Sequence, residues 1–155
     1  MDISVVVPTF RRPRSLRRAL GSCARQVRAP SVEGVVVDNC PHASARDVVR
    51  EAATRSPFPV RYEHESCAGV SSARNAGVSA AKGDLIAFLD DDNEAAPDWL
   101  ASLVHAHAES GADAVFGSVI AELEGQPRPD AELYLTAFHR VLPEPAGPVR
   151  SRYVA

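Results

Sequence analysis

Residues 85–93 read LIAFLDDDN, five apolar residues followed directly by three aspartates. A short run that is apolar at every position is typical of a strand buried on both faces, as in a mostly parallel sheet covered by helices. Open sheets of this kind bind ligands at the carboxyl ends of their strands, which is where these aspartates stand. The stretch therefore predicts an α/β fold with an acidic site at one edge of the sheet.

The three adjacent carboxylates of Asp90, Asp91 and Asp92 are electrostatically costly to hold together. Two unit charges about 4 Å apart repel by about 4 kcal/mol at an effective dielectric constant near 20. A divalent cation that also holds a diphosphate would relieve this repulsion, because Mg²⁺ and Mn²⁺ prefer carboxylate, phosphate and water oxygens. The acid run alone leaves a solvated acidic turn before the next helix as the alternative.

Composition restricts the class of protein without naming its function. The chain has 155 residues, of which 45% are hydrophobic and 24% are charged, as expected for one soluble domain. Its formal net charge of −3 provides no basic surface for nucleic acid, so we expect no nucleic-acid partner.

Cysteine usage and hydropathy bear on the compartment. Cys23, Cys40 and Cys67 lack the spacing of metal ligands and predict free thiols in a reducing environment. The chain opens without a signal-peptide pattern, and no apolar stretch approaches the ~20 residues of a membrane span. We therefore expect a cytoplasmic protein, with peripheral attachment to a membrane left open.

Strand and helix patterns alternate along the chain. Apolar, β-branched runs predict strands at residues 3–7, 35–37, 60–64, 85–89 and 114–123, the third of them nearer a sheet edge. Helical spacing is found at residues 13–25, 43–55 and 97–110, and a segment of small residues at 67–83 predicts a helix packed very close to the sheet, with Gly83 as its stop. This alternation predicts an α/β sheet with right-handed crossovers. The dinucleotide motif G-x-G-x-x-G and the P-loop motif are both missing from the sequence.

Four segments taken together resemble the inverting family-2 glycosyltransferases with a GT-A fold. They are SVVVPTFRR at 4–12, VVVDN at 35–39, GVSSARNAGVSAAKGDLIAFLDDDN at 69–93 and PDWL at 97–100. The resemblance covers residues 3–123 in the order and spacing of the family. It implies a mostly parallel sheet flanked by helices. It also implies transfer of a sugar, with inversion and help from Mg²⁺ or Mn²⁺, from a nucleoside-diphosphate sugar to a hydroxyl acceptor.

The resemblance assigns four residues near the first two strands to the nucleoside. Pro8 and Thr9 match a loop that lies against it, although a strand terminator and a helix cap would use the same residue types. Asp38 matches an acidic position that helps to hold the nucleoside. The family often has a second aspartate next, where this chain has Asn39, and an amide can both donate and accept. The base is therefore left open.

The resemblance assigns four further residues to the rest of the donor. Arg74 matches an arginine facing the nucleotide, against the alternative of a surface arginine on a helix. Asp92 is expected to be the direct metal ligand, Asp91 the contact to ribose or a second contact, and Asp90 a supporting residue.

The catalytic base is expected outside the given chain. Inversion needs a general base, which this family places in the acceptor half, so we expect it beyond Ala155. The resemblance divides the chain into a nucleotide-sugar-binding half, residues 1–123, and a proline-rich, partly helical connection to a truncated acceptor half, residues 124–155. Five later carboxylates stand in no recognisable context: Glu122, Glu124, Asp130, Glu132 and Glu144.

Several alternatives stay open at this point. The acceptor could be a sugar, a lipid-linked sugar or a small molecule. A non-catalytic module that kept the nucleotide-sugar pocket and lost the base is the main alternative, and a nucleotidyltransferase ranks lower because its lysine-bearing glycine loop is missing. A homodimer through the apolar residues of 131–142 is a further hypothesis.

Overall fold

The structure is a computed structural model that describes residues 2–27, 31–122 and 135. Strands and helices alternate through this part of the chain. In order they are β1 (Ile3–Thr9), α1 (Pro13–Ala24), β2 (Val32–Asp38), α2 (Arg46–Arg55), β3 (Val60–His64), α3 (Val70–Ala80), β4 (Leu85–Phe88) and α4 (Trp99–Ser110).

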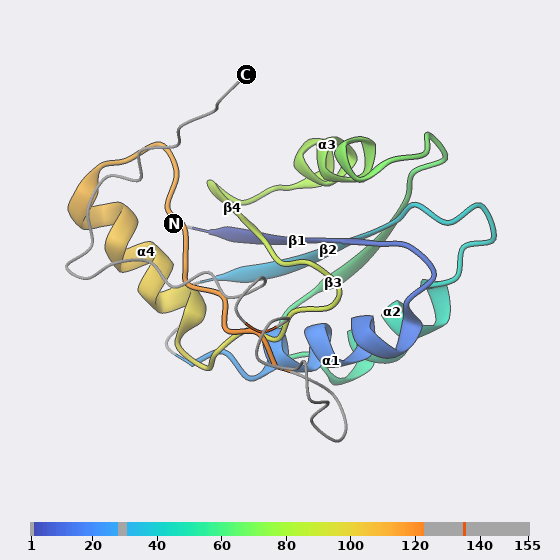
Figure 1. The fold of residues 1–155 in the computed structure, drawn as a ribbon, viewed down its shortest axis with the longest axis horizontal. Coiled ribbons are helices and arrows are strands. Elements are labelled where there is room, and N and C mark those ends of the chain that lie inside the picture. The colour runs from blue at the N-terminus through green and yellow to red at the C-terminus, as the bar shows by residue number, and fades with distance from the viewer. Residues whose placement is uncertain (1, 28–30, 123–134, 136–155) are drawn as a thin grey trace.

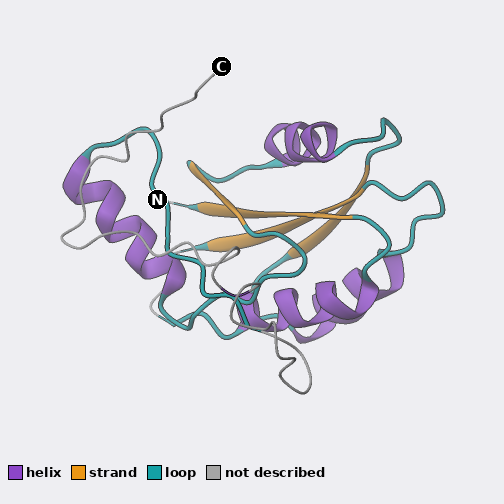
Figure 2. Cartoon of the chain, in the orientation of Figure 1, coloured by secondary structure: helices purple, strands orange, loops and turns teal. Residues whose placement is uncertain are grey.

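The four described strands form one parallel sheet in the order β3-β2-β1-β4. In the centre of the sheet, Val6 of β1 lies opposite Val35 of β2 on one side and Phe88 of β4 on the other. Helices α1 and α2 cover one face and α3 covers the other (Figure 1, Figure 2). The chain moves outward from β1 to β3 and then returns to the far side of β1. The crevice between β1 and β4 is therefore the switch point at which sheets of this class bind ligands.

The core follows from the two-residue period of the strands. One face of the sheet packs on α1 and α2 through buried residues that include Val5, Val7, Val36, Leu16 and Val48. The opposite face packs on α3 through Val6, Val35, Val37 and Ala73. The apolar runs of β1 and β2 are therefore buried on both sides, as their composition predicts.

Helix α3 lies very close to the sheet, as its small residues predict. A Cβ atom on Gly77 would fall far inside van der Waals contact with Val6 Cγ1 and 3.2 Å from Val37 Cγ2. Gly83 is not the stop of the helix, which ends at Ala80. Its hydrogen side chain is needed for another reason, because a Cβ there would lie 2.7 Å from the backbone nitrogen of Ser4.

Two predictions about strands are wrong within the described residues. Strand β4 is not buried on both faces, because it is the last strand of this sheet and leaves Ile86 and Phe88 38% and 44% exposed. Residues 114–122 form no strand and show only an isolated bridge at Val119. The apolar composition of residues 114–122 is therefore not sufficient to make this segment a strand of the described sheet. The edge position of β3 is confirmed.

Helix boundaries differ from the predicted ones at two amino termini. Helix α2 begins at Arg46, three residues late, because Ala43 adopts a positive φ of 52° within a turn closed by its own N–H and the carbonyl of Cys40. Helix α4 begins at Trp99, two residues after Pro97. The predicted domain boundary at 123 and the stretch 131–142 lie outside the described residues, apart from Leu135.

The cysteines are free thiols, as predicted. Cys23 and Cys40 are buried, and burial raises the pKa of the Cys23 thiol to about 11. Cys67 is exposed. None of the helices that the structure describes is both long and apolar enough to cross a membrane.

Candidate functional site

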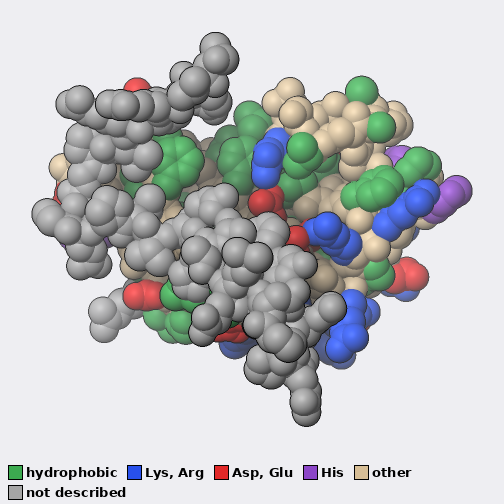
Figure 3. All heavy atoms as spheres, viewed as in Figure 1, with side chains coloured by type: hydrophobic (Ala, Val, Ile, Leu, Met, Phe, Trp, Pro, Cys, Tyr) green, Lys and Arg blue, Asp and Glu red, His purple; other side chains and the backbone are tan. Residues whose placement is uncertain are grey.

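A cleft opens at the carboxyl ends of β1 and β4, beside the first turn of α3. Its volume is about 570 Å³, within the roughly 300–1,000 Å³ common for small-molecule sites. Acidic and basic side chains lie next to one another just below α3 in Figure 3. The lining residues are Pro8, Thr9, Phe10, Arg12, Asn39, Ala68, Gly69, Val70, Ala73, Arg74, Asp90, Asp91 and Asp92. Seven of the eight residues predicted from the sequence are among them.

A hydrogen bond between residues at the carboxyl ends of β1 and β4 forms the floor of the cleft. Thr9 closes β1, is 4% exposed, and donates its hydroxyl to Asp91 Oδ2 at 2.7 Å. Asp91 is 6% exposed, and a buried carboxylate is costly unless it is paired and hydrogen-bonded. Arg12 supplies the charge partner at 3.3 Å from Asp91 Oδ1. The parallel pairing of β1 with β4 thus brings residues 82 positions apart into one hydrogen bond.

Arg12 also reaches the next carboxylate. Its Nη1 donates to Asp92 Oδ2 at 2.7 Å, where both side chains are more than half exposed. The negative charges of Asp91 and, second, of Asp92 raise the pKa of the Arg12 guanidinium. One arginine therefore partly neutralises two of the three aspartates.

Arg74 pairs with the remaining aspartate from the other side of the cleft. Its Nη2 lies 2.8 Å from Asp90 Oδ1, and its guanidinium carbon lies 6.0 Å from the ring centroid of Phe88. Arg74 comes from α3 and faces the strand ends, so it lines the cleft rather than the outer surface of the helix.

The three aspartates pair with two arginines, Asp91 and Asp92 with Arg12 and Asp90 with Arg74, and they do not form a ready-made metal cage. Among the described residues, no group of three or more histidine, cysteine, aspartate or glutamate side chains is placed to hold a metal ion. Asp92 alone still fits a cation that takes most of its ligands elsewhere, because Mg²⁺ is commonly held by one or two carboxylates together with substrate phosphates. Its exposed ion pair with Arg12 is of a kind worth only about 0–1 kcal/mol and can be exchanged.

Asn39 lines the cleft, but its amide is engaged in holding the opposite wall. Its Nδ2 donates to the carbonyl oxygens of Glu65 and Cys67, both at 2.7 Å, and its Oδ1 accepts from the N–H of Gly69 at 2.8 Å. If the side-chain amide of Asn39 were flipped by 180°, its oxygen would face two carbonyl oxygens that it cannot hydrogen-bond, so the orientation is fixed. Asn39 therefore shapes the loop before α3, and its hydrogen-bonding groups are largely used.

Asp38 is the predicted residue that the structure does not place in the cleft lining. Its side chain is fully buried and accepts hydrogen bonds from the N–H groups of Cys40 at 3.0 Å and Ala45 at 2.7 Å. The hydroxyl of Tyr62 lies 3.3 Å from Asp38 Oδ2. These contacts fasten the turn from β2 to α2, which gives the carboxylate a structural role in this conformation.

Replacing Asn39 by aspartate is expected to open the loop at residues 65–69. A carboxylate cannot donate to the carbonyls of Glu65 and Cys67, and each of these part-buried hydrogen bonds is of a kind worth about 0.5–1.5 kcal/mol of unfolding free energy. Amide hydrogen exchange over this loop should accelerate in Asn39→Asp. The exposed Asn75 on α3 provides the control, since Asn75→Asp makes the same chemical change. Equal protection of the loop in both variants would contradict this role.

Sequence reasoning missed Arg12, Phe10 and Gly69. A signal for Arg12 was available, because Arg11 and Arg12 directly follow the first strand and the acid run directly follows the fourth. Recognising the contact required the strand order, which puts β1 beside β4. Gly69 has a φ of 128°, a conformation that favours glycine, and its N–H is the one bound by Asn39.

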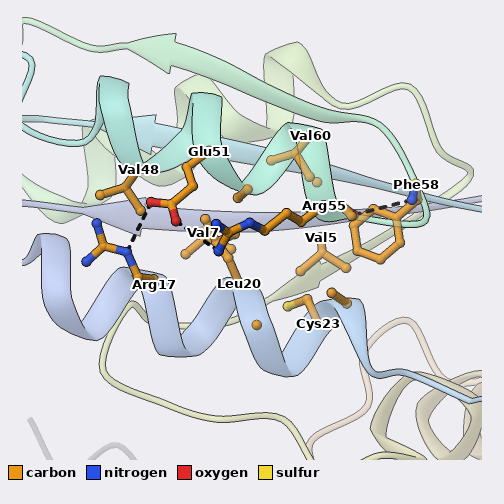
Figure 4. A pocket seen from close by; sticks show the side chains of 15 residues that line it. Val5, Val7, Arg17, Leu20, Cys23, Val48, Glu51, Arg55, Phe58 and Val60 are labelled. Carbon is orange, nitrogen blue, oxygen red and sulfur yellow. Dashed lines mark hydrogen bonds and ion pairs between the residues drawn. The ribbon is translucent and has the colours of Figure 1, made fainter.

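A second hollow lies between α1, α2 and the sheet, and it has a different character. It encloses about 130 Å³ and is lined mainly by apolar side chains such as Val5, Leu20 and Phe58. Glu51 spans its rim, 3.4 Å from Arg17 and 2.9 Å from Arg55 (Figure 4). The cleft at the strand ends is larger and gathers several charged side chains in its lining, so it is the stronger candidate.

Comparison with curated proteins identifies relatives that include a protein of polysaccharide biosynthesis and a protein named as a glucosyltransferase. Succinoglycan biosynthesis protein ExoM of Rhizobium meliloti is 33% identical over 157 residues, covering 99% of this chain and 50% of that protein. Validoxylamine A glucosyltransferase of Streptomyces hygroscopicus subsp. limoneus is 36% identical over 138 residues, covering 88% of this chain and 30% of that protein. The chain thus spans half or less of the length of these two relatives.

Comparison with solved structures confirms the fold. S. aureus TarS 1-349 in complex with UDP aligns with a TM-score of 0.65 and 22% identity, over 83% of this chain and 38% of that one. Mannosyltransferase PcManGT from Pyrobaculum calidifontis, in complex with GDP-Man and Mn²⁺, aligns with a TM-score of 0.63 and 26% identity. That alignment covers 70% of this chain and 32% of the mannosyltransferase. The predicted parallel sheet of GT-A type is therefore present.

A family model that matches most of the chain identifies the family. The family model described as "Glycosyl transferase family 2" matches residues 4–133, which include all four segments that carried the resemblance and every residue that lines the cleft. This chain belongs to glycosyl transferase family 2.

Proposed function

We propose that this chain is the donor-binding part of a glycosyltransferase that uses a nucleoside-diphosphate sugar and transfers the sugar to a hydroxyl acceptor with inversion. The observation that carries the proposal is the meeting of Arg12, Arg74 and three aspartates in one cleft at the switch point of the sheet. Family membership supports it, as do structural neighbours whose titles name complexes with UDP and with GDP-Man and Mn²⁺.

The two arginines are the proposed partners of the diphosphate. Guanidinium groups match phosphate oxygens in geometry and charge, and both Arg12 and Arg74 line the cleft from opposite sides. Each is now paired with a carboxylate at 2.7–2.8 Å. An entering diphosphate would add anionic oxygens to these guanidinium groups without requiring a new element of structure.

Asp92 is the proposed ligand of a divalent cation, Mg²⁺ or Mn²⁺, which would be shared with the diphosphate. The neighbour that holds Mn²⁺ supports a divalent cation without fixing which ion this chain uses. When bound, such an ion supplies Lewis-acid stabilisation of charge on the leaving diphosphate. Asp92 suits this position because it is exposed and makes the most solvent-accessible ion pair of the acidic run with Arg12.

The nucleoside is proposed to lie between Pro8 and Thr9 on one side and the loop at Gly69 on the other. Asp91 and Asp90 are the proposed contacts for the ribose and its surroundings. Asn39 would act on the nucleoside chiefly by fixing Gly69, since its amide is already engaged. Asp38 would act in the same indirect way, through the turn after β2.

The general base is proposed to lie outside the cleft described here. The acidic residues that line the cleft, among the described ones, are the three aspartates already assigned to the donor. Of the later carboxylates, Glu122 is exposed and Glu124, Asp130, Glu132 and Glu144 lie outside the described residues. The same observation keeps a non-catalytic nucleotide-sugar-binding module as the second candidate. The acceptor is proposed to be a sugar, a lipid-linked sugar or a small molecule.

Release of nucleoside diphosphate separates these functions. The full-length protein is incubated with sugar derivatives of UDP, GDP, dTDP, CDP and ADP, each with Mn²⁺ or Mg²⁺ and with a panel of sugar acceptors whose hydroxyl groups can take the transferred sugar. Binding is measured by calorimetry, and the free diphosphate is measured over time. We expect cation-dependent release from the derivatives of one base. Cation-dependent binding without release would select the non-catalytic module, and neither binding nor release would contradict both candidates.

A further inference from the structure

Arg12 occupies a position that neither the family description nor the proposed roles above explain fully. It is the residue before α1, and its carbonyl accepts the N–H of Leu16 at 3.0 Å, so its backbone is fixed by the start of the helix. The preceding Arg11 adopts a positive φ of 55° and places its guanidinium carbon 5.0 Å from the ring centroid of Phe10. This turn separates the two arginines, so that Arg12 alone bridges Asp91 and Asp92.

The two contacts of Arg12, 3.3 Å to Asp91 and 2.7 Å to Asp92, differ in burial. The Asp91 carboxylate is 8% exposed and also accepts the Thr9 hydroxyl, so it is held firmly. The Arg12–Asp92 pair is exposed on both sides, 56% and 54%, and such pairs are readily exchanged. Arg12 is thus held at the buried carboxylate of Asp91, whereas its exposed pair with Asp92 can be exchanged for another partner. That second carboxylate is the one proposed to bind the cation.

The guanidinium of Arg12 opposes a lone cation at Asp92, although the net charge of the cleft does not. Three carboxylates are offset by two guanidinium groups, which leaves a small excess of negative charge. A divalent ion at Asp92 would have to displace Arg12 and would then lie close to its positive charge. A diphosphate removes this conflict, because it gives both the ion and Arg12 additional anionic oxygens.

We propose that Arg12 is a positioning residue that occupies Asp92 in place of the cation, so that the cation enters the cleft together with the nucleoside diphosphate and not before it. The inference rests on the proposed function. Binding of the two ligands is then coupled, and by linkage each raises the affinity of the other by the same factor. The sequence order of Arg12 and the acid run gives no hint of this competition, which arises only where β1 meets β4.

The proposal is tested without any measurement of activity by titrating the full-length protein with Mn²⁺. Binding is monitored by electron paramagnetic resonance, in which the signal of the free ion decreases as the ion binds. The variants are Arg12→Gln, Arg12→Lys and Arg14→Gln. Arg14 lies in the first turn of α1 and is exposed, so Arg14→Gln removes the same charge close by without touching the acidic pair. Each protein is titrated alone and with UDP, GDP, dTDP, CDP or ADP.

We expect Arg12→Gln to bind Mn²⁺ alone roughly tenfold more tightly than the wild type, within the usual range of coupling between sites. The Mn²⁺ affinity of Arg12→Lys and of Arg14→Gln should remain near that of the wild type, because a positively charged side chain still pairs with Asp92 in both variants. The diphosphate that the protein binds should raise the Mn²⁺ affinity of the wild type much more than that of Arg12→Gln. Thermal melting of each variant shows that it is folded.

Two results would overturn the proposal in different ways. If diphosphate promotes Mn²⁺ binding in the wild type but Arg12→Gln behaves like Arg14→Gln, the role of Arg12 is wrong while the proposed function stands. If the wild type binds no Mn²⁺ with any of the five diphosphates, the coupling is absent and the cation-assisted function fails with it.

Discussion

Asp92→Ala is expected to weaken cation-dependent binding of the nucleoside diphosphate by on the order of 100-fold, since even the loss of an outer partner of a metal ligand costs about 10–100-fold. The fold should be unaffected. The side chain of Asp92 is 54% exposed, and its ion pair with Arg12 is of the surface type that contributes about 0–1 kcal/mol. Isothermal titration with Mn²⁺ present and absent measures the effect, and a thermal melt checks the fold.

Asp113→Ala is the matched control for this variant. Asp113 is an exposed aspartate on the segment after α4 and does not line the cleft, so its removal changes the net charge equally. Retention of Mn²⁺-dependent affinity in Asp92→Ala, at the level of Asp113→Ala, would show that the assigned metal ligand is wrong.

Gly77→Ala is expected to destabilise the protein markedly through the addition of a single methyl group. The added Cβ would overlap Val6 and press on Val37 in the centre of the sheet. Overpacking of this kind costs about 1–3 kcal/mol. At roughly 2–4 °C per kcal/mol for a domain near this size, we expect the melting temperature to fall by about 2–12 °C. Because α3 carries Arg74, nucleotide binding should weaken as well.

Gly21→Ala provides an unusually close comparison, because it also places alanine inside a helix. The nearest atom to a Cβ at Gly21 is 3.4 Å away and belongs to the flexible end of Arg25. Alanine in a helix interior is favoured over glycine by about 0.5–1 kcal/mol, so this variant should be neutral or slightly more stable. Equal melting temperatures for the two variants would contradict the close packing of α3.

Much of the fold could be predicted because its signals are local. The valine runs of β1 and β2 are apolar at every position, and both strands are buried on both faces. The small residues of α3 predict close packing, and Gly77 provides it. The acid run after β4 predicts carboxylates at the edge of the sheet, where Asp91 and Asp92 lie.

The errors concern features that depend on neighbours distant in sequence. The LIAF strand is apolar throughout, yet its exposure depends on what lies beyond β4 in the sheet. Residues 114–122 have a strand-like composition but no continuous partner among the described residues. Hydropathy records which residues can be buried and does not record which segment will bury them.

The candidate site shows the same division at the level of single side chains. The residue types around the cleft are visible in the sequence, but their partners are not. Asp38 is predicted to help hold the nucleoside, and nothing in the sequence indicates that its carboxylate accepts from the N–H groups of its own turn. Asn39 is committed to a loop nearly thirty residues away, and Arg12 to carboxylates about eighty residues away. A hydrogen-bond network of this range follows from strand order and cannot be read from spacing.

The central claim is that the cleft between β1, β4 and α3 binds a nucleoside diphosphate together with a divalent cation. A thermal-shift panel of UDP, GDP, dTDP, CDP and ADP, each with and without Mn²⁺, tests it on the wild type and on Arg74→Gln. A ligand at 100 times its dissociation constant adds about 2.7 kcal/mol. We expect one diphosphate to raise the melting temperature of the wild type by about 5–10 °C with Mn²⁺ present, and Arg74→Gln to lose this shift. No shift with any of the five, or a full shift in Arg74→Gln, would contradict the account.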